Sequence, residues 1–96
     1  MKIVKTGIAG TMESSDVLVT VSPGRIDGVE VEIDSVVIKQ FGKQIRAVTK
    51  ETLENLGVTD AFVSLQDKGA LDCTIRARLE AATHRAAGTT QYQWRR

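Results

Sequence analysis

The chain has 96 residues and a formal net charge of +1, because 13 lysines and arginines offset 12 aspartates and glutamates. This length suits one small domain, and 42% hydrophobic with 26% charged residues is the composition of a globular protein rather than a disordered one. The balanced charge excludes the strong basic footprint that nucleic-acid binding needs. No stretch approaches the roughly 18 consecutive apolar residues of a membrane span, and the amino end lacks a signal-peptide pattern. We therefore expect a cytoplasmic protein that binds neither nucleic acid nor membrane.

Residues 1–9 mix apolar and basic side chains and indicate no definite element. Apolar side chains then alternate with polar ones along 17–22 and again along 29–34, and each alternation predicts a strand with one buried face. The stretch 22–28 between them contains the only proline of the chain and two glycines, which is typical of a turn. We expect the two strands to form a hairpin.

A helix is predicted over 36–56, because apolar or small side chains recur there every three or four residues. These residues are Val37, Phe41, Ile45, Val48, Thr52 and Leu56. Gly57 follows at the position where helices commonly end. The stretch 61–66 predicts a third strand, and Asp67-Lys68-Gly69-Ala70 has the composition of a tight turn.

The next stretch, 71–77, has two interpretations. Its alternation favours a fourth strand that passes into a helix over 78–87. The competing interpretation starts that helix at Leu71, since Leu71, Ile75 and Leu79 also fit one helical face. With the strand, the fold is α+β: a two-layer ββαββα sandwich whose mainly antiparallel sheet of about four strands has two helices on one face. The domain would span 1–88, and 89–96 would form a polar tail that is either frayed or a docking peptide.

Few residues in the chain suggest catalysis. His84 is the only histidine, and we expect it partly exposed near the end of the second helix. Cys73 is the only cysteine, which excludes an internal disulfide; it is more typical of a small buried residue than of a reactive thiol. Acidic side chains share one strand face and favour a solvated surface over a cation site: Glu30, Glu32 and Asp34. We expect no catalytic residue and no metal.

The polar stretch Gly10-Thr11-Met12-Glu13-Ser14-Ser15-Asp16 lies immediately ahead of the first strong strand, and we expect an exposed loop. A serine on such a loop can be modified without disturbing a core.

Three stretches together resemble the acyl carrier (gamma) subunit of citrate lyase. They are Gly10–Asp16, Gln40-Phe41-Gly42, and Asp67–Cys73 followed by Ala77-Arg78-Leu79-Glu80-Ala81-Ala82. The resemblance implies that Ser14, the first serine of the Glu-Ser-Ser-Asp block, carries a 2'-(5''-triphosphoribosyl)-3'-dephospho-CoA type group through a phosphodiester. Ser14 is preferred to Ser15 by position in that block alone.

The resemblance also implies a role and partners. The chain would be a non-catalytic carrier of acetyl and citryl thioesters between a transferase (alpha) and a lyase (beta) subunit, which convert citrate to acetate plus oxaloacetate. An attaching enzyme would load Ser14, with Glu13 and Asp16 as recognition or positioning charges. Lys68 is a candidate partner for the phosphates of the group. The alternatives are the carrier of citramalate lyase or malonate decarboxylase, or an unmodified adaptor that binds a protein partner.

Overall fold

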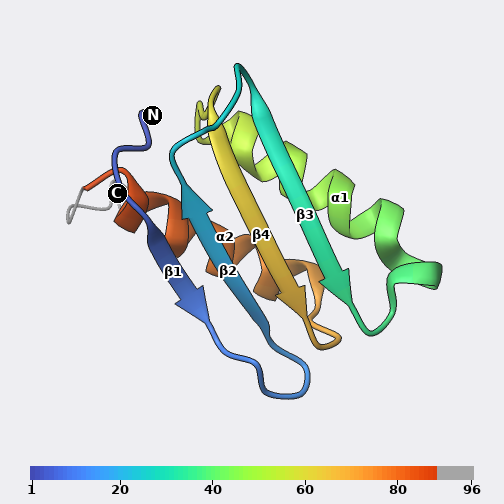
Figure 1. Cartoon of the computed structure of the whole chain (residues 1–96). Coiled ribbons are helices and arrows are strands. Elements are labelled where there is room, and N and C mark those ends of the chain that lie inside the picture. Colours follow the sequence, from blue (N-terminus) through green and yellow to red (C-terminus); the bar gives the residue numbers. More distant parts are fainter. Residues whose placement is uncertain (89–96) are drawn as a thin grey trace.

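The computed structural model describes residues 1–88, in which a sheet of four strands carries both helices on one face (Figure 1). The predicted α+β two-layer class is therefore confirmed. The elements follow one another as βββαβα instead of ββαββα. They are β1 (Gly7–Gly10), β2 (Val17–Ser22), β3 (Val29–Ser35), α1 (Ile38–Asn55), β4 (Ala61–Asp67) and α2 (Asp72–Ala86).

The strands lie in the order β1-β2-β4-β3, so the predicted hairpin of 17–22 with 29–34 is wrong. Strand β4 lies between them: Val63 is opposite Val21 of β2 in an antiparallel pair and opposite Val31 of β3 in a parallel pair. Since α1 connects β3 to β4 as a crossover, these two strands pair in parallel. The sheet is mixed, with two antiparallel pairings and one parallel pairing.

The stretch 71–77 is helical, so the favoured fourth strand is wrong and the competing interpretation is right. Helix α2 begins at Asp72 and buries Ile75, Leu79 and Ala82 completely at spacings of four and three residues. Cys73 faces solvent, which corrects the expectation of a small buried residue. A strand would have placed Cys73 on the same face as Ile75, whereas a helix turns the two side chains apart.

The fourth strand of the sheet is β1, in the stretch for which the sequence indicated no element. Its backbone rests directly on α2: a methyl group at Gly7 would overlap the carbonyl oxygen of Ala82 and lie 2.5 Å from the amide nitrogen of Ala86. Only a residue without a side chain permits this approach. The contact fixes β1, and with it the loop that follows.

The core lies between the sheet and the helices. On α1 it takes Ile45, Val48 and Thr52 from the predicted stripe, whereas Phe41 of the same stripe remains 46% exposed. His84 lies in the last turn of α2 as expected, but it is buried, with 9% of its surface exposed. The predicted tail, 89–96, lies outside the described residues.

Candidate functional site

The loop between β1 and β2 presents Ser14 at the tip of a tight turn. The amide of Asp16 donates to the carbonyl oxygen of Glu13 at 3.1 Å, which leaves Ser14 and Ser15 as the two central residues. Within residues 1–88, Ser15 is the only non-glycine residue with a positive φ, +65°. A positive φ at only the third position is the pattern of a type II turn, in which glycine is the usual residue there. Ser14 precedes it, exposed, with ordinary backbone geometry.

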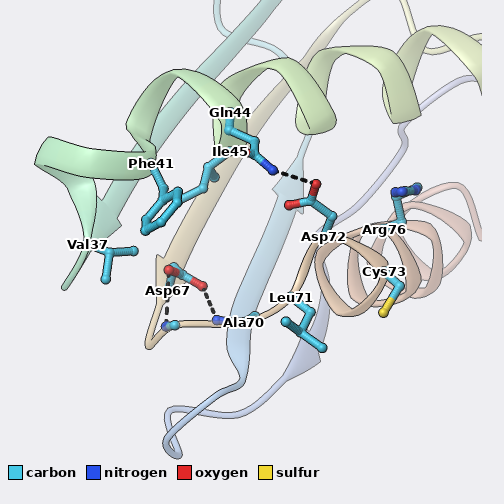
Figure 2. A pocket seen from close by; sticks show the side chains of 11 residues that line it. Val37, Phe41, Gln44, Ile45, Asp67, Ala70, Leu71, Asp72, Cys73 and Arg76 are labelled. Atoms are coloured by element: carbon cyan, nitrogen blue, oxygen red, sulfur yellow. Dashed lines mark hydrogen bonds between the residues drawn. The ribbon is translucent and has the colours of Figure 1, made fainter.

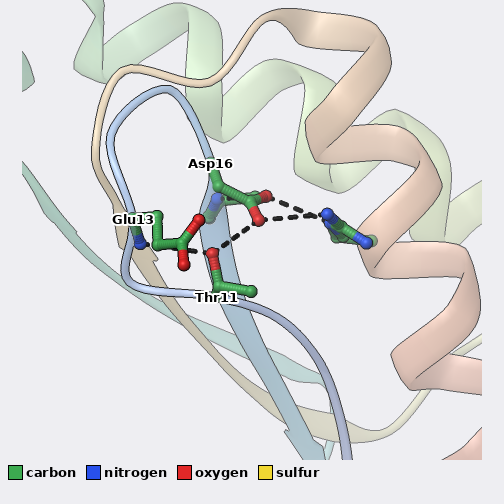
Figure 3. A network of polar contacts seen from close by, with 5 residues as sticks. Thr11, Glu13 and Asp16 are labelled. Carbon is green, nitrogen blue, oxygen red and sulfur yellow. Dashed lines mark hydrogen bonds and ion pairs between the residues drawn. The ribbon is translucent and has the colours of Figure 1, made fainter.

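Asp16 anchors one side of the loop (Figure 3). Its Oδ1 accepts hydrogen bonds from the Val17 amide at 2.7 Å and Arg78 Nε at 3.0 Å. Its Oδ2 accepts from Thr11 Oγ1 at 2.7 Å and from an Arg78 Nη atom at 3.0 Å. Chiefly through the bonds from Arg78, and then that from Thr11, the pKa of Asp16 is lowered from 3.8 to about 2. Asp16 is thus an ionised and partly buried anchor, while Glu13 faces solvent.

The other side of the loop is bound to the turn between β4 and α2. The amide of Ser15 donates to the carbonyl oxygen of Lys68 at 2.9 Å, and the amide of Lys68 donates to the carbonyl oxygen of Asp16 at 2.9 Å. Gly10 begins the loop with φ +94°, and a side chain there would overlap the carbonyl oxygen of Val17. Both ends of the loop are therefore fixed by backbone contacts.

The predicted turn at Asp67-Lys68-Gly69 is confirmed. The Asp67 carboxylate accepts hydrogen bonds from the amides of Gly69 at 3.1 Å and Ala70 at 2.9 Å, and Gly69 has φ +92°. An aspartate that bonds the following backbone and a glycine with positive φ are the usual components of such a turn.

The remaining candidates lie away from the loop. On β3, Glu32 and Asp34 are exposed, and Glu30 forms an ion pair with Arg25 at 3.2 Å. Among residues 1–88, no group of three histidine, cysteine or acidic residues is placed to hold a metal ion. Sequence reasoning missed the roles of Thr11 and Arg78. Their one signal is that both stand in stretches that carry the family resemblance.

The comparisons agree with that resemblance. The family model described as "Malonate decarboxylase delta subunit (MdcD)" matches residues 4–86. The citrate lyase acyl carrier protein of Streptococcus uberis is 54% identical over 95 residues, 99% of this chain and 93% of that protein. The chain belongs to the citrate lyase acyl carrier protein family. Another member, from Albidiferax ferrireducens, is 53% identical over 94 residues, 98% of this chain and 96% of that protein.

The family's fold also occurs in a solved structure. One chain of a Pseudomonas malonate decarboxylase hetero-tetramer in complex with malonate matches with a TM-score of 0.71 and 18% identity, over 90% of this chain and 92% of that chain. At that identity the likeness establishes the fold alone. Neither helix within residues 1–88 combines the length and apolar character needed to cross a membrane.

Proposed function

We propose that this chain is the acyl carrier subunit of a cytoplasmic citrate lyase complex and that Ser14 is the attachment site of a phosphoribosyl dephospho-CoA type group. When attached, that group supplies a thiol on which acetyl and citryl units pass between the transferase and lyase subunits. The observation that carries the proposal is the exposed Ser14 hydroxyl at the tip of a turn whose two sides are fixed.

The residues around Ser14 fit a large attached group. Within residues 1–88, no hydrogen bond engages the Ser14 hydroxyl, so a phosphodiester there costs no existing contact. The Asp16 carboxylate already accepts hydrogen bonds from Thr11 and Arg78, so these side chains do not need the Ser14 hydroxyl as a partner. The protein's contribution is to hold the turn in place and project one oxygen into solvent, while the thiol chemistry belongs to the group.

The turn geometry supports Ser14 over Ser15. Ser15 occupies the left-handed position, and its amide donates to Lys68, so this residue forms part of the anchor. Ser14 has neither a left-handed conformation nor a backbone hydrogen bond to Lys68. Lys68 follows β4 beside the turn, and its ammonium group suits the phosphates of the attached group. The exposed Glu13 is the charge available to the attaching enzyme.

Intact mass of the chain purified with the attaching enzymes present tests the proposal. Wild type and Ser15→Gly are expected to carry the added mass, whereas Ser14→Ala is expected to have the mass of the bare polypeptide. The glycine variant is the matched control, because glycine suits the conformation of residue 15. An active complex containing an unmodified chain, or a modified Ser14→Ala variant, would contradict the proposal.

The carriers of malonate decarboxylase and citramalate lyase are the second candidates. The matching family model, described as a malonate decarboxylase subunit, favours malonate decarboxylase of these two. Purified complex separates the candidates by substrate: cleavage of citrate but not of malonate or citramalate supports the proposed assignment. A complex that cleaves malonate or citramalate in its place would assign the chain to that system.

A further inference from the structure

An open groove of about 620 Å³ lies between the start of α1 and the start of α2 (Figure 2). It is beside the loop between β1 and β2 that carries Ser14 (the serine loop). This volume is within the range of sites that bind small organic molecules. Most of the groove wall is apolar and comes from both sides of the gap. The principal apolar lining residues are Val37, Phe41, Ile45, Ala70 and Leu71.

Two of these apolar side chains, Leu71 and Phe41, are exposed to solvent. Leu71 is 71% exposed and occupies the N-cap of α2, where it makes no capping hydrogen bond. Serine or aspartate at an N-cap would stabilise the helix by about 1 kcal/mol relative to an apolar residue. Phe41, on the α1 side, is 46% exposed. Both side chains are apolar surface that an occupant of the groove would cover.

A single buried carboxylate holds both walls of the groove. Asp67 is 2% exposed and binds the amides of Gly69 and Ala70 on the α2 side. It also accepts a hydrogen bond from Ser35 Oγ at 2.8 Å, and that hydroxyl in turn accepts from the Val37 amide at 3.1 Å, ahead of α1. The spacing of the walls is therefore fixed before any occupant arrives.

The groove and the serine loop share one segment of backbone. Lys68, whose carbonyl oxygen accepts from the Ser15 amide, is followed directly by Gly69 and Ala70 in the groove lining. Polar groups stand at the opposite side, where Gln44 Nε2 donates to Asp72 Oδ2 at 2.8 Å and Arg76 adds a cation. The apolar walls suit the methyl and methylene groups of a flexible thiol-bearing chain attached at Ser14 (the arm), and the polar groups suit the amides of that arm.

We propose that the arm attached to Ser14 folds back into this groove and packs its apolar parts between Phe41 and Leu71. The inference rests on the proposed function, since it needs an arm on Ser14. The occupied groove shields the terminal thiol from solvent between visits to the catalytic subunits. The exposed leucine and phenylalanine are then surfaces that the arm covers.

Two measurements on the full chain test this, after intact mass has confirmed loading. The first compares backbone amide NMR shifts of the bare and loaded protein; we expect changes at Phe41, Gln44 and Leu71 as well as in the loop. The second is the rate at which iodoacetamide alkylates the arm thiol, measured by peptide mapping so that alkylation of the exposed Cys73 is counted separately. We expect Leu71→Ser, which supplies a better N-cap, to raise this rate severalfold. The matched control is Ile26→Ser, because Ile26 is 61% exposed and lies outside the groove lining.

Each outcome decides something different. Loaded protein whose shift changes are confined to the loop, with equal alkylation rates in all three proteins, would overturn the groove while leaving the proposed function intact. The same result with loss of complex assembly in Leu71→Ser would assign the groove to a partner subunit and also overturn the inference. A chain of bare mass from an active complex would overturn the proposed function and the groove together.

Discussion

Replacing Asp16 by asparagine tests whether one carboxylate fixes the serine loop. The amide has nearly the same shape and keeps one oxygen for the Val17 amide. Its NH₂ group, however, would face an N–H donor of Arg78 where the carboxylate now accepts, although the Thr11 hydroxyl can turn to accept from it. The variant therefore loses the charge-assisted bonds and opposes donor to donor, with little change in packing.

The size of the effect follows from the pKa of Asp16. A value lowered from 3.8 to about 2 corresponds to at most about 2.5 kcal/mol, at roughly 1.4 kcal/mol per pKa unit. The Arg78 side chain is 42% exposed, and solvent screening reduces the net contribution to about 1–2 kcal/mol. Because the folded pKa is below the unfolded one, this contribution is fully present above pH 3.8 and is lost as the pH falls toward 2.

Urea unfolding followed by far-ultraviolet circular dichroism at several pH values measures this difference. We expect Asp16→Asn to be about 1–2 kcal/mol less stable than wild type at pH 7, and the two proteins to converge between pH 4 and 2. The control is Glu13→Gln, an exposed neighbour expected to differ from wild type by less than about 0.5 kcal/mol. A wild type and Asp16→Asn of equal stability at pH 7, or a gap that persists unchanged at pH 2, would refute the reasoning.

Three further substitutions have expected outcomes in the same unfolding assay. Gly7→Ala should cost about 2–4 kcal/mol, because its methyl group meets backbone of Ala82 that cannot rotate away; a loss below 1 kcal/mol would contradict the close approach. Asp67→Ala should cost about 3 kcal/mol or more, since it strands the Ser35 hydroxyl and two amides; a neutral result would argue against this network. Ser15→Gly should be neutral or up to about 1 kcal/mol stabilising, and a clear loss would count against the left-handed turn position.

The strands could be predicted because their alternation is local, but their partners could not. Val17, Val19 and Val21 alternate inward and are fully buried as expected. Nothing in the strands at 17–22 and 29–35 says that a strand more than 25 residues further along will pair with both. A β-branched face fits either neighbour, so the pairing is decided by the α1 crossover and by the core as a whole.

The stretch after Asp67 shows a different limit. Leu71, Ile75 and Leu79 satisfy both a strand and a helix period, and the decisive fact is which residues the core accepts. In the structure the stretch is a helix that packs against β1 and β2. Gly7, the glycine that permits β1 to rest on α2, carries no apolar signal, so the sequence alone does not indicate this strand.

The site was predictable only to the level of its loop. The composition of Gly10–Asp16 correctly indicated an exposed loop ahead of a strand, and the family resemblance singled out Ser14 within it. The partner of Asp16 is Arg78, 62 residues later, and no local pattern identifies such a pair. The groove depends likewise on α1, the turn after β4 and α2 coming together.

These distant contacts bear on how the serine is recognised. The turn that presents Ser14 is held by Arg78 of α2 and by Lys68 after β4, neither of which is near the loop in an unfolded chain. A short peptide spanning the loop would lack both anchors and would hold Ser15 in its left-handed conformation only rarely. The geometry around the serine therefore exists only after the whole domain has folded. If the attaching enzyme of the proposed function recognises this geometry, we expect it to act on the folded carrier, so that loss of folding and loss of loading occur together.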